Sequence, residues 1–311
     1  MLFPLPASVP GGEKWRKEKE MEYEGQICRS PMERASFMLP VAVGCSHNAC
    51  SFCMLFKHLQ YRVLPREQVF AEIDRVAAIG GNPERVFLGD GNAFSLSASQ
   101  LIEILEKLRA SFPGLRSVAM DSTVKNILDK SDEELARLRE LGVTDLYLGI
   151  ECALEDVLDF VNKGNTLAQA ENAIERLHRA GIDYDAHIMT GICGHGRGEE
   201  NARALADFFL RTRPLRICNF SLFLHKRAPL YRDVLGGRYV PADELENLKE
   251  ELLLLEGLEG LEAVYDGMHD FIPFRVRGRL PADRETMCAK LRAEIERLEQ
   301  EPESIAIGIV E

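Results

Sequence analysis

The chain has 311 residues, of which 46% are hydrophobic and 28% charged, and its 50 acidic and 38 basic residues give a formal net charge of −12. This length and apolar content suit one large domain with appendages, or two modest domains. A protein that tracks a nucleic-acid backbone normally carries a basic face, so the acidic excess disfavours a nucleic-acid substrate while leaving room for a local basic patch.

The first part of the chain, residues 1–37, is predicted to be an irregular arm. Pro4, Pro6 and Pro10 interrupt its apolar start and charged residues follow, so it lacks an apolar core of the length that a signal peptide needs. No window approaches the ~20 apolar residues of a membrane span. These features predict a cytoplasmic protein without membrane contact. In that reducing compartment, eight cysteines indicate metal or redox chemistry and not disulfides.

From Met38 onward, short apolar runs alternate with amphipathic stretches of helical period. Strands are expected at 38–44, 85–91, 115–122, 145–151, 183–192 and 216–224, and helices at 66–80, 97–112, 131–142, 167–181 and 200–212. This order predicts an α/β fold with a parallel sheet, because parallel strands need long crossover connections. Ser131 and Glu134 have the pattern of a capping box, and Gly80, Gly142 and Gly181 stand where helices should end.

The alternation stops after about Leu224. A long acidic helix is expected at 242–259, then an irregular aromatic segment, and then a charged helix near 284–300. The predicted organisation is therefore an arm (1–37), an α/β unit (38–224) and a C-terminal extension (225–311).

The strongest chemical signal is the segment GCSHNACSFC at 44–53, which directly follows the first predicted strand. Loops at the C-terminal ends of parallel strands form the ligand face, so Cys45, Cys50 and Cys53 can all point at one object. A zinc ribbon needs a fourth ligand nearby, and the next cysteine, Cys152, lies far along the chain. Three thiolates on one loop fit a four-iron cluster better, because its fourth iron can stay open. A zinc-binding structural or regulatory protein remains the alternative.

On these residues the chain resembles the radical S-adenosylmethionine superfamily. That superfamily usually spaces its cysteines by three and then two residues and places an aromatic residue just before the last. Here Phe52 is the aromatic residue, but four residues separate Cys45 from Cys50, which resembles a large, poorly characterised branch. Over about residues 25–290, the resemblance implies a 4Fe-4S cluster, S-adenosyl-L-methionine as cofactor, and a partial (β/α)6 TIM-like barrel with an arm and a helical extension. It implies no substrate.

The resemblance also assigns cofactor contacts to the turn after the second strand. Gly89, Asp90, Gly91 and Asn92 occupy the place of the glycine-rich motif whose carbonyls accept hydrogen bonds from the methionyl ammonium. Asp90 would add a charge-assisted partner. The alternative is a tight strand–helix turn that uses glycine for its dihedral freedom.

Further contacts are implied at the ends of the third to fifth strands. Ser122 could contact the cofactor or belong to a helix cap. Glu151 resembles the polar residue that contacts the ribose hydroxyls, and Lys163 resembles a basic residue that pairs with the methionyl carboxylate, with a solvent-facing lysine as the alternative. His187 would lie beside the ribose and Ile192 beside adenine, although a lone histidine on an apolar strand can also be a satisfied core residue.

The chemistry implied by the resemblance is reductive cleavage of S-adenosylmethionine to a 5'-deoxyadenosyl radical, which acts on a small-molecule substrate. The subclass (oxidoreductase, lyase or transferase) stays open. An electron donor of flavodoxin or ferredoxin type is expected, because the sequence holds no second evident cluster motif. The five other cysteines are expected to be buried small hydrophobes.

Substrate contacts are expected from the arm and from the C-terminal extension. Within the segment HDFIPF, aromatic and polar residues alternate around a proline, which suits the mouth of a cavity or a cap over the barrel. His269 is the residue predicted to be catalytic. The candidates in the extension are His225, Lys226, Tyr231, His269, Asp270, Phe271 and Arg275.

Overall fold

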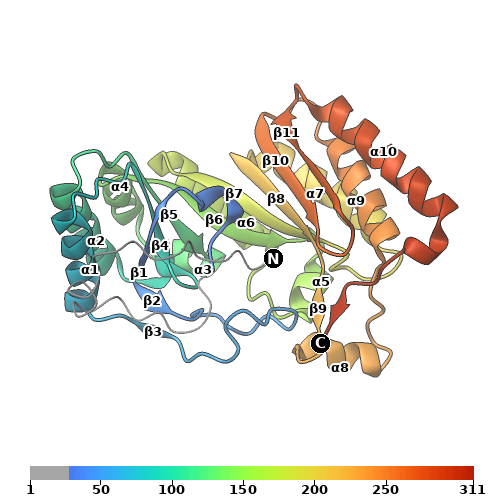
Figure 1. The fold of residues 1–311 in the computed structure, drawn as a ribbon, viewed down its shortest axis with the longest axis horizontal. Helices are drawn as coiled ribbons and strands as arrows, with labels where there is room; N and C mark the ends of the chain where they lie inside the picture. The colour runs from blue at the N-terminus through green and yellow to red at the C-terminus, as the bar shows by residue number, and fades with distance from the viewer. Residues whose placement is uncertain (1–27) are drawn as a thin grey trace, which may run out of the picture.

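An eight-stranded sheet organises the computed structural model, which describes residues 28–311 (Figure 1). In spatial order the strands are β1 (Phe37–Pro40), β4 (Arg85–Gly89), β5 (Ser117–Ser122), β6 (Val143–Glu151), β7 (Asp183–Thr190), β8 (Arg216–Ser221), β10 (Ala263–His269) and β11 (Phe274–Leu280). All neighbouring pairs are parallel except β10 with β11. The first six are the strands predicted from the sequence, so the α/β fold is confirmed. Of the predicted arm, residues 1–27 lie outside the described residues.

Helices cover one face of this sheet, which we call the outer face. Those that pack there are α1 (Arg66–Ala78), α2 (Ala98–Ser111), α4 (Asp132–Glu140), α6 (Leu167–Ala180), α7 (Gly198–Thr212), α9 (Glu244–Gly257) and α10 (Arg284–Gln300). The shorter helices are α3 (Val124–Leu128), α5 (Glu155–Phe160) and α8 (Pro229–Leu235). Figure 1 shows α1 and α2 at one end of the sheet and α9 and α10 at the other. Among the described helices, none has both the length and the apolar character to cross a bilayer.

The remaining elements are short. Two small sheets pair β2 (Ala42–Val43) with β3 (Arg62–Val63) and β9 (Leu224–His225) with β12 (Ile309–Val310). Three 3-10 turns complete the description: η1 (Pro31–Glu33), η2 (Ala93–Ser95) and η3 (Pro302–Ser304).

Local sequence signals explain where several helices begin and end. The Ser131 side chain accepts a hydrogen bond from the N–H of Glu134, whose carboxylate in turn accepts one from the N–H of Ser131, so the predicted capping box is present at α4. Gly181 is the C-cap of α6. The sequence pattern thus sets the ends of the helices that space the parallel strands.

The C-terminal extension departs from the sequence prediction. The segment expected to be irregular forms the hairpin of β10 and β11, and the HDFIPF segment supplies its turn. β10 lacks an alternating pattern because both of its faces are mostly buried, with Tyr265 on one side and Asp266 on the other. Because both faces of β10 are buried in the folded protein, the alternation of apolar and polar residues could not reveal this strand in the sequence.

The face opposite the helices, the inner face, carries the site. Directly paired residues point to the same side of a sheet. By this register Met38, Phe87, Ala119 and Tyr147 share the inner face, where they pack as a small separate cluster. Further along the same face lies a row of polar and apolar side chains from β7, β8 and β10.

A buried polar network links the end of the arm to the inner face. Glu33 is fully buried and accepts hydrogen bonds from the hydroxyl of Tyr147 at 2.8 Å and from Arg85 at 2.8 Å. Arg216 lies 2.7 Å from Asp185 and 3.3 Å from the Tyr147 hydroxyl. Because these charges are paired, Glu33 fixes the described end of the arm against the sheet.

Candidate functional site

The cysteine loop follows β2 at the C-terminal edge of the sheet. Cys45, Cys50 and Cys53 are half-buried and all three thiols are free. The loop is tied to the segment after α5, because the N–H of Ser51 donates to the carbonyl of Val161 at 2.8 Å. The three thiols are therefore gathered at the edge where the sequence placed the ligand face.

The chemistry of three free thiols on one loop suits a four-iron cluster, because thiolates are the usual ligands of such clusters. Among the residues that the structure describes, no three His, Cys, Asp or Glu side chains are placed to hold a single metal ion. In a four-iron cluster each thiolate binds a different iron, so its ligands need not converge on one point. The thiols still influence one another: burial raises the pKa of Cys50 to about 11, Lys163 opposes the rise, and Cys53 and Cys45 add to it.

The GDGN turn lies directly against the cysteine loop. Gly91 has a φ of 66°, and a Cβ at this position would overlap the carbonyl oxygen of Gly44, so glycine is required here for both conformation and space. Asp90 accepts hydrogen bonds from the N–H of Gly91 at 2.9 Å and of Cys28 at 3.3 Å. Burial raises the pKa of this carboxyl group.

Asn92 positions the cysteine loop. Its amide oxygen accepts the N–H of Ser46 at 2.9 Å, and its amide nitrogen donates to the Ser46 hydroxyl at 2.9 Å and to the side-chain oxygen of Asn126 at 2.7 Å. The side chain is thereby committed to protein partners. The turn after β4 thus supplies glycine and carboxylate to the site and an amide clamp to the loop.

Glu151 and Lys163 meet each other beside the thiols. Lys163 Nζ lies 2.6 Å from Glu151 Oε1, and the two side chains are only 12% and 11% exposed. On either side of Lys163 in the chain, the Asn162 carbonyl contacts His47 of the cysteine loop at 2.8 Å, and a Cβ at Gly164 would meet the His47 ring. Burial alone would lower the pKa of Lys163, but Glu151 and Cys50 raise it above its usual range. The solvent-facing alternative for this lysine is thus wrong.

His187 projects from β7 onto the inner face. Its ring lies 5.3 Å from that of Tyr147 and 5.7 Å from that of Phe220. Its Nε2 atom is buried and has no hydrogen-bond partner among the described residues. Burial lowers the pKa of His187 to about 4, although Glu151 opposes this, so the imidazole is neutral near pH 7. A buried, unpartnered ring nitrogen is what a ribose hydroxyl could satisfy.

An apolar wall completes the site. Phe52 and Ile192, both predicted to contact the cofactor, belong to the same buried cluster, against which Cys50 and Cys53 pack. The loop of Ile192 is fixed by Tyr239, whose hydroxyl lies 3.2 Å from the Ile192 carbonyl. The thiols, the glycine turn, the buried ion pair and the apolar wall lie at the C-terminal edge of the sheet. The His187 imidazole lies on the adjoining inner face.

Comparison with known families agrees with this arrangement. The Radical SAM superfamily matches the chain over residues 39–209, more than half of its length. The chain belongs to this superfamily. It is therefore a radical SAM enzyme, and membership implies a 4Fe-4S cluster and S-adenosylmethionine. The residues present fit both groups: Cys45, Cys50 and Cys53 offer free thiols to a cluster, and the buried, unpartnered Nε2 atom of His187 could pair with a ribose hydroxyl. This match rules out the alternative of a zinc-binding structural or regulatory protein without radical chemistry.

Two anaerobic cyclases are similar in sequence to this radical SAM enzyme over part of their length. It is 28% identical over 155 residues to the anaerobic magnesium-protoporphyrin IX monomethyl ester cyclase of Cereibacter sphaeroides and 29% identical over 164 residues to that of Rubrivivax gelatinosus. The alignments cover 49% and 52% of this chain but 24% and 28% of the two cyclases, so the chain spans about a quarter of the relatives' length.

Solved structures agree in fold. The radical S-adenosylmethionine methyltransferase TsrM from Kitasatospora setae, with tryptophan substrate and a SAM analogue bound, gives a TM-score of 0.52 at 19% identity, covering 66% of this chain and 40% of that one. Its form with cobalamin and a [4Fe-4S] cluster gives 0.51 at 19% identity, covering 63% and 38%. This likeness supports the partial barrel and nothing finer.

Two residues that were not predicted to contact the cofactor, Asp121 and Cys28, lie close to the GDGN turn. The register puts Asp121 on the inner face, whereas Ser122, predicted to contact the cofactor, faces away and donates to the Thr123 carbonyl at 3.1 Å. Burial and the charges of Asp90 and Glu33 raise the pKa of Asp121 to about 8. Strand parity was the signal that could have separated Asp121 from Ser122.

Cys28 was set aside with the other scattered cysteines, yet the structure brings it to the site. Its N–H donates to Asp90, and burial, reinforced by Asp121, Asp90 and Cys53, raises the pKa of its thiol to about 12. No spacing in the sequence links Cys28 to the cysteine loop, because only the return of the arm onto the sheet brings the two together.

His269 lies away from the thiols, at the outer face. Its side chain is fully buried between two carboxylates of α9, with Nδ1 2.6 Å from Glu244 and Nε2 2.9 Å from Glu251. Burial lowers the pKa of His269, but the two hydrogen bonds outweigh it and raise the pKa to about 9. The predicted catalytic role stays a prediction, and this placement favours a role in fixing the β10–β11 hairpin to α9.

Replacing His269 by glutamine should cost stability in a pH-dependent manner. The protonated imidazole is favoured in the folded state, so its contribution is complete below its ordinary pKa of 6.5 and is lost as the pH rises through about 9. We expect the variant to be less stable than the wild type by roughly 3 kcal/mol near pH 6, with the gap closing towards pH 10. Urea unfolding across this range measures the gap.

Several titratable groups surround His269 and also influence how stability changes with pH. Glu244 and Glu251 contact its ring, Asp270 follows it in the chain, and Tyr265 donates to Glu251 at 2.8 Å. The matched control is His178→Gln on the exposed side of α6, which should change stability little at any pH. A gap for His269→Gln that stays constant or widens as the pH rises contradicts the assignment.

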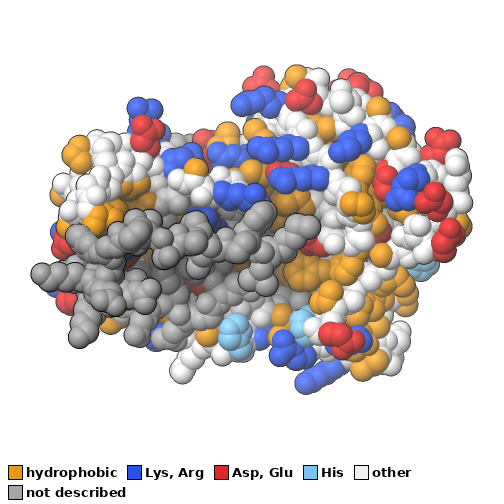
Figure 2. All heavy atoms as spheres, viewed as in Figure 1, with side chains coloured by type: hydrophobic (Ala, Val, Ile, Leu, Met, Phe, Trp, Pro, Cys, Tyr) orange, Lys and Arg blue, Asp and Glu red, His pale blue; other side chains and the backbone are white. Residues whose placement is uncertain are grey.

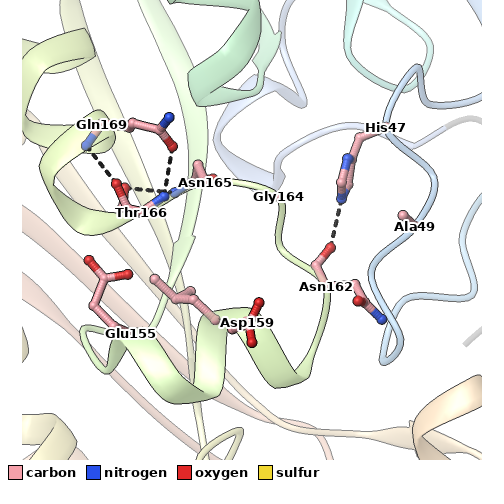
Figure 3. A pocket seen from close by; sticks show the side chains of 10 residues that line it. His47, Ala49, Glu155, Asp159, Asn162, Gly164, Asn165, Thr166 and Gln169 are labelled. Carbon is pink, nitrogen blue, oxygen red and sulfur yellow. Dashed lines mark hydrogen bonds between the residues drawn. The ribbon is translucent and has the colours of Figure 1, made fainter.

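A hollow of about 510 Å³ adjoins the exposed side of the cysteine loop (Figure 3). His47 and Ala49 form one wall, and Glu155, Asp159 and the 162–169 segment form the other. Figure 3 shows His47 pointing across to the Asn162 backbone. Because Ser46 and Ala49 are exposed, the loop that carries the thiols reaches the molecular surface here.

Proposed function

We propose that Cys45, Cys50 and Cys53 hold a 4Fe-4S cluster in this radical SAM enzyme and that the neighbouring strand ends hold S-adenosylmethionine for action on a small-molecule substrate. The observation that carries the proposal is the set of three free thiols beside a buried Glu151–Lys163 pair and an unpartnered His187 nitrogen. When bound, the two groups supply one-electron cleavage of a carbon–sulfur bond and a 5'-deoxyadenosyl radical.

The roles of the chain's own residues follow from charge and position. The Gly89–Asp90 turn offers a carbonyl and a carboxylate to an ammonium group, and Lys163 offers a cation to a carboxylate. Glu151 and His187 lie close enough to interact electrostatically, and both would form hydrogen bonds with the ribose hydroxyls. Phe52 and Ile192 would exclude water from the reacting region, which protects a reactive radical from side reactions.

Lys163 and Glu151 contact each other in this structure, so cofactor binding would have to divide the pair. Each buried charge then needs a new partner, because an unpaired buried charge is costly. The methionyl carboxylate would replace Glu151 at Lys163, and ribose hydroxyls would replace Lys163 at Glu151. The pair thus keeps the pocket neutral until the cofactor enters.

Every radical SAM enzyme needs an electron donor, and we propose one of flavodoxin or ferredoxin type. The exposed Ser46 and Ala49, beside the hollow, give such a donor a short approach to the cysteine loop. Eight free cysteines fit the reducing conditions of the cytoplasm, where these donors work. The 225–311 extension would contribute the substrate contacts.

The proposal is tested by anaerobic reconstitution with iron and sulfide. The protein should take up about four irons per chain and, with dithionite, convert S-adenosylmethionine to methionine and 5'-deoxyadenosine. Protein that loads four irons yet never cleaves the cofactor would falsify the proposal. Aerobically purified protein with one tightly held zinc and no capacity for iron would contradict it equally.

A further inference from the structure

Strand β11 carries a row of arginines on the inner face of the sheet. Arg275, Arg277 and Arg279 alternate along the strand with the buried side chains that pack under α10. The antiparallel register pairs them with Met268, Asp266 and Val264 of β10, respectively, so all six side chains share the inner face. This is the face that also bears His187.

The row has more positive charge than its neighbours neutralise. Asp266 is fully buried and binds Arg275 through both oxygens, at 2.6 and 2.5 Å, while Arg277 lies 3.9 Å from the same carboxylate. Arg277 is 65% exposed, and the Arg279 side chain has no carboxylate partner among the described residues. Arg277 and Arg279 therefore have guanidinium donors available. Figure 2 shows Lys and Arg side chains gathered over β8, β10 and β11.

Protection of the sheet edge does not explain this pattern. Charged residues on an edge strand, basic ones above all, do prevent pairing with other chains, but this protection does not require three charges of one sign on one face. Three arginines on one face stand about 7 Å apart and repel one another. They do so in a chain whose net charge is −12, so composition does not favour arginine here. Asp266 neutralises only one of the three charges, so an anion could pair with Arg277 and Arg279.

An apolar strip joins the arginines to the cofactor site. Met189, Phe220 and Met268 lie at successive strands of the inner face, at one register level, and all three are half-buried. The same level ends at Arg275 on β11. On the inner face, the side chains of Met189, Phe220 and Met268 therefore lie between the His187 side and the arginines of β11.

We propose that Arg277 and Arg279 bind the anionic end of the substrate, phosphate or carboxylate, while its apolar part lies over Met189, Phe220 and Met268. Arg275, which is paired with Asp266, borders this site and contributes to its electrostatic potential. The inference rests on the proposed function for the reaction itself. It adds the chemical class of the substrate: a small amphiphilic molecule with one or more oxyanion groups.

The test is calorimetric titration of the anaerobically reconstituted protein with inorganic tripolyphosphate, citrate and an oligothymidylate, in separate runs. The double variant R277Q/R279Q removes both available guanidinium groups. The matched control, R203Q/R211Q, removes the same charge from exposed arginines of α7, on the outer face. Because Arg275 and Asp266 are unchanged in both, the hairpin should fold in each.

We expect saturable binding of tripolyphosphate, citrate or both, weakened by about tenfold or more in R277Q/R279Q, since hydrogen bonds to charged groups contribute that much. R203Q/R211Q should bind like the wild type. Tripolyphosphate alone identifies a phosphorylated substrate, and citrate a polycarboxylate. The proposal is overturned if neither small anion binds, if both double variants weaken binding equally, or if only the oligothymidylate binds. Cofactor cleavage by the same wild-type sample reports separately on the proposed function.

Discussion

Replacing Cys45, Cys50 and Cys53 together by alanine should reduce bound iron and sulfide to background and abolish reductive cleavage of S-adenosylmethionine. Each of these thiols is free and half-buried at the loop that meets the GDGN turn. A cluster cannot persist in a polypeptide that offers it no thiolate. Iron and sulfide assays after anaerobic reconstitution, with product analysis by chromatography, measure both losses.

The matched control for this experiment is Cys288→Ala. Cys288 is fully buried in α10 within the main core, far from the cysteine loop. The Cys288→Ala variant should be slightly less stable than the wild type, but it should retain the full iron content and cleave the cofactor at the wild-type rate. Iron retained by the triple variant, or lost by Cys288→Ala, would show that other cysteines hold the cluster.

Replacing Gly91 by alanine should be nearly as severe, although no ligand is removed. Its φ of 66° already disfavours a side chain, and the added methyl group would overlap the carbonyl oxygen of Gly44, directly before Cys45. The cysteine loop or the GDGN turn would have to move. We expect iron loading to fall to a small fraction of the wild-type value, together with cofactor cleavage.

Gly80→Ala separates backbone strain from this contact. Gly80 has a φ of 80°, close to that of Gly91, but nothing lies within 4 Å of the position of a Cβ. The control should lose about 1 kcal/mol of stability and load a normal cluster. Equal iron contents in the two variants would contradict the idea that the GDGN backbone seats the cysteine loop.

The sequence was sufficient for the elements whose evidence is local. Alternating strand and helix patterns, a capping box at Ser131 and three cysteines in one loop need no tertiary information, and all are present in the structure. The six parallel strands followed from the length of the crossovers. The family resemblance then supplied the cluster and the cofactor, and the strand-end contacts that it implies stay predictions.

What the sequence could not supply depends on contacts between distant segments. Cys28 reaches the site only because Glu33 anchors the arm. The Glu151–Lys163 pair joins the end of β6 to the segment after α5. Burial on both faces hid β10 from any test of alternation. The arginine row of β11 gained its meaning only when the register put it on the inner face.

The proposed chemistry depends most on an open iron that binds S-adenosylmethionine beside Cys45, Cys50 and Cys53. Electron paramagnetic resonance of the reduced, anaerobically reconstituted protein tests this most directly, with and without S-adenosylmethionine. We predict a cluster signal whose g values shift when S-adenosylmethionine is added. A protein with a full iron content and an unchanged signal would contradict the binding of S-adenosylmethionine to the cluster.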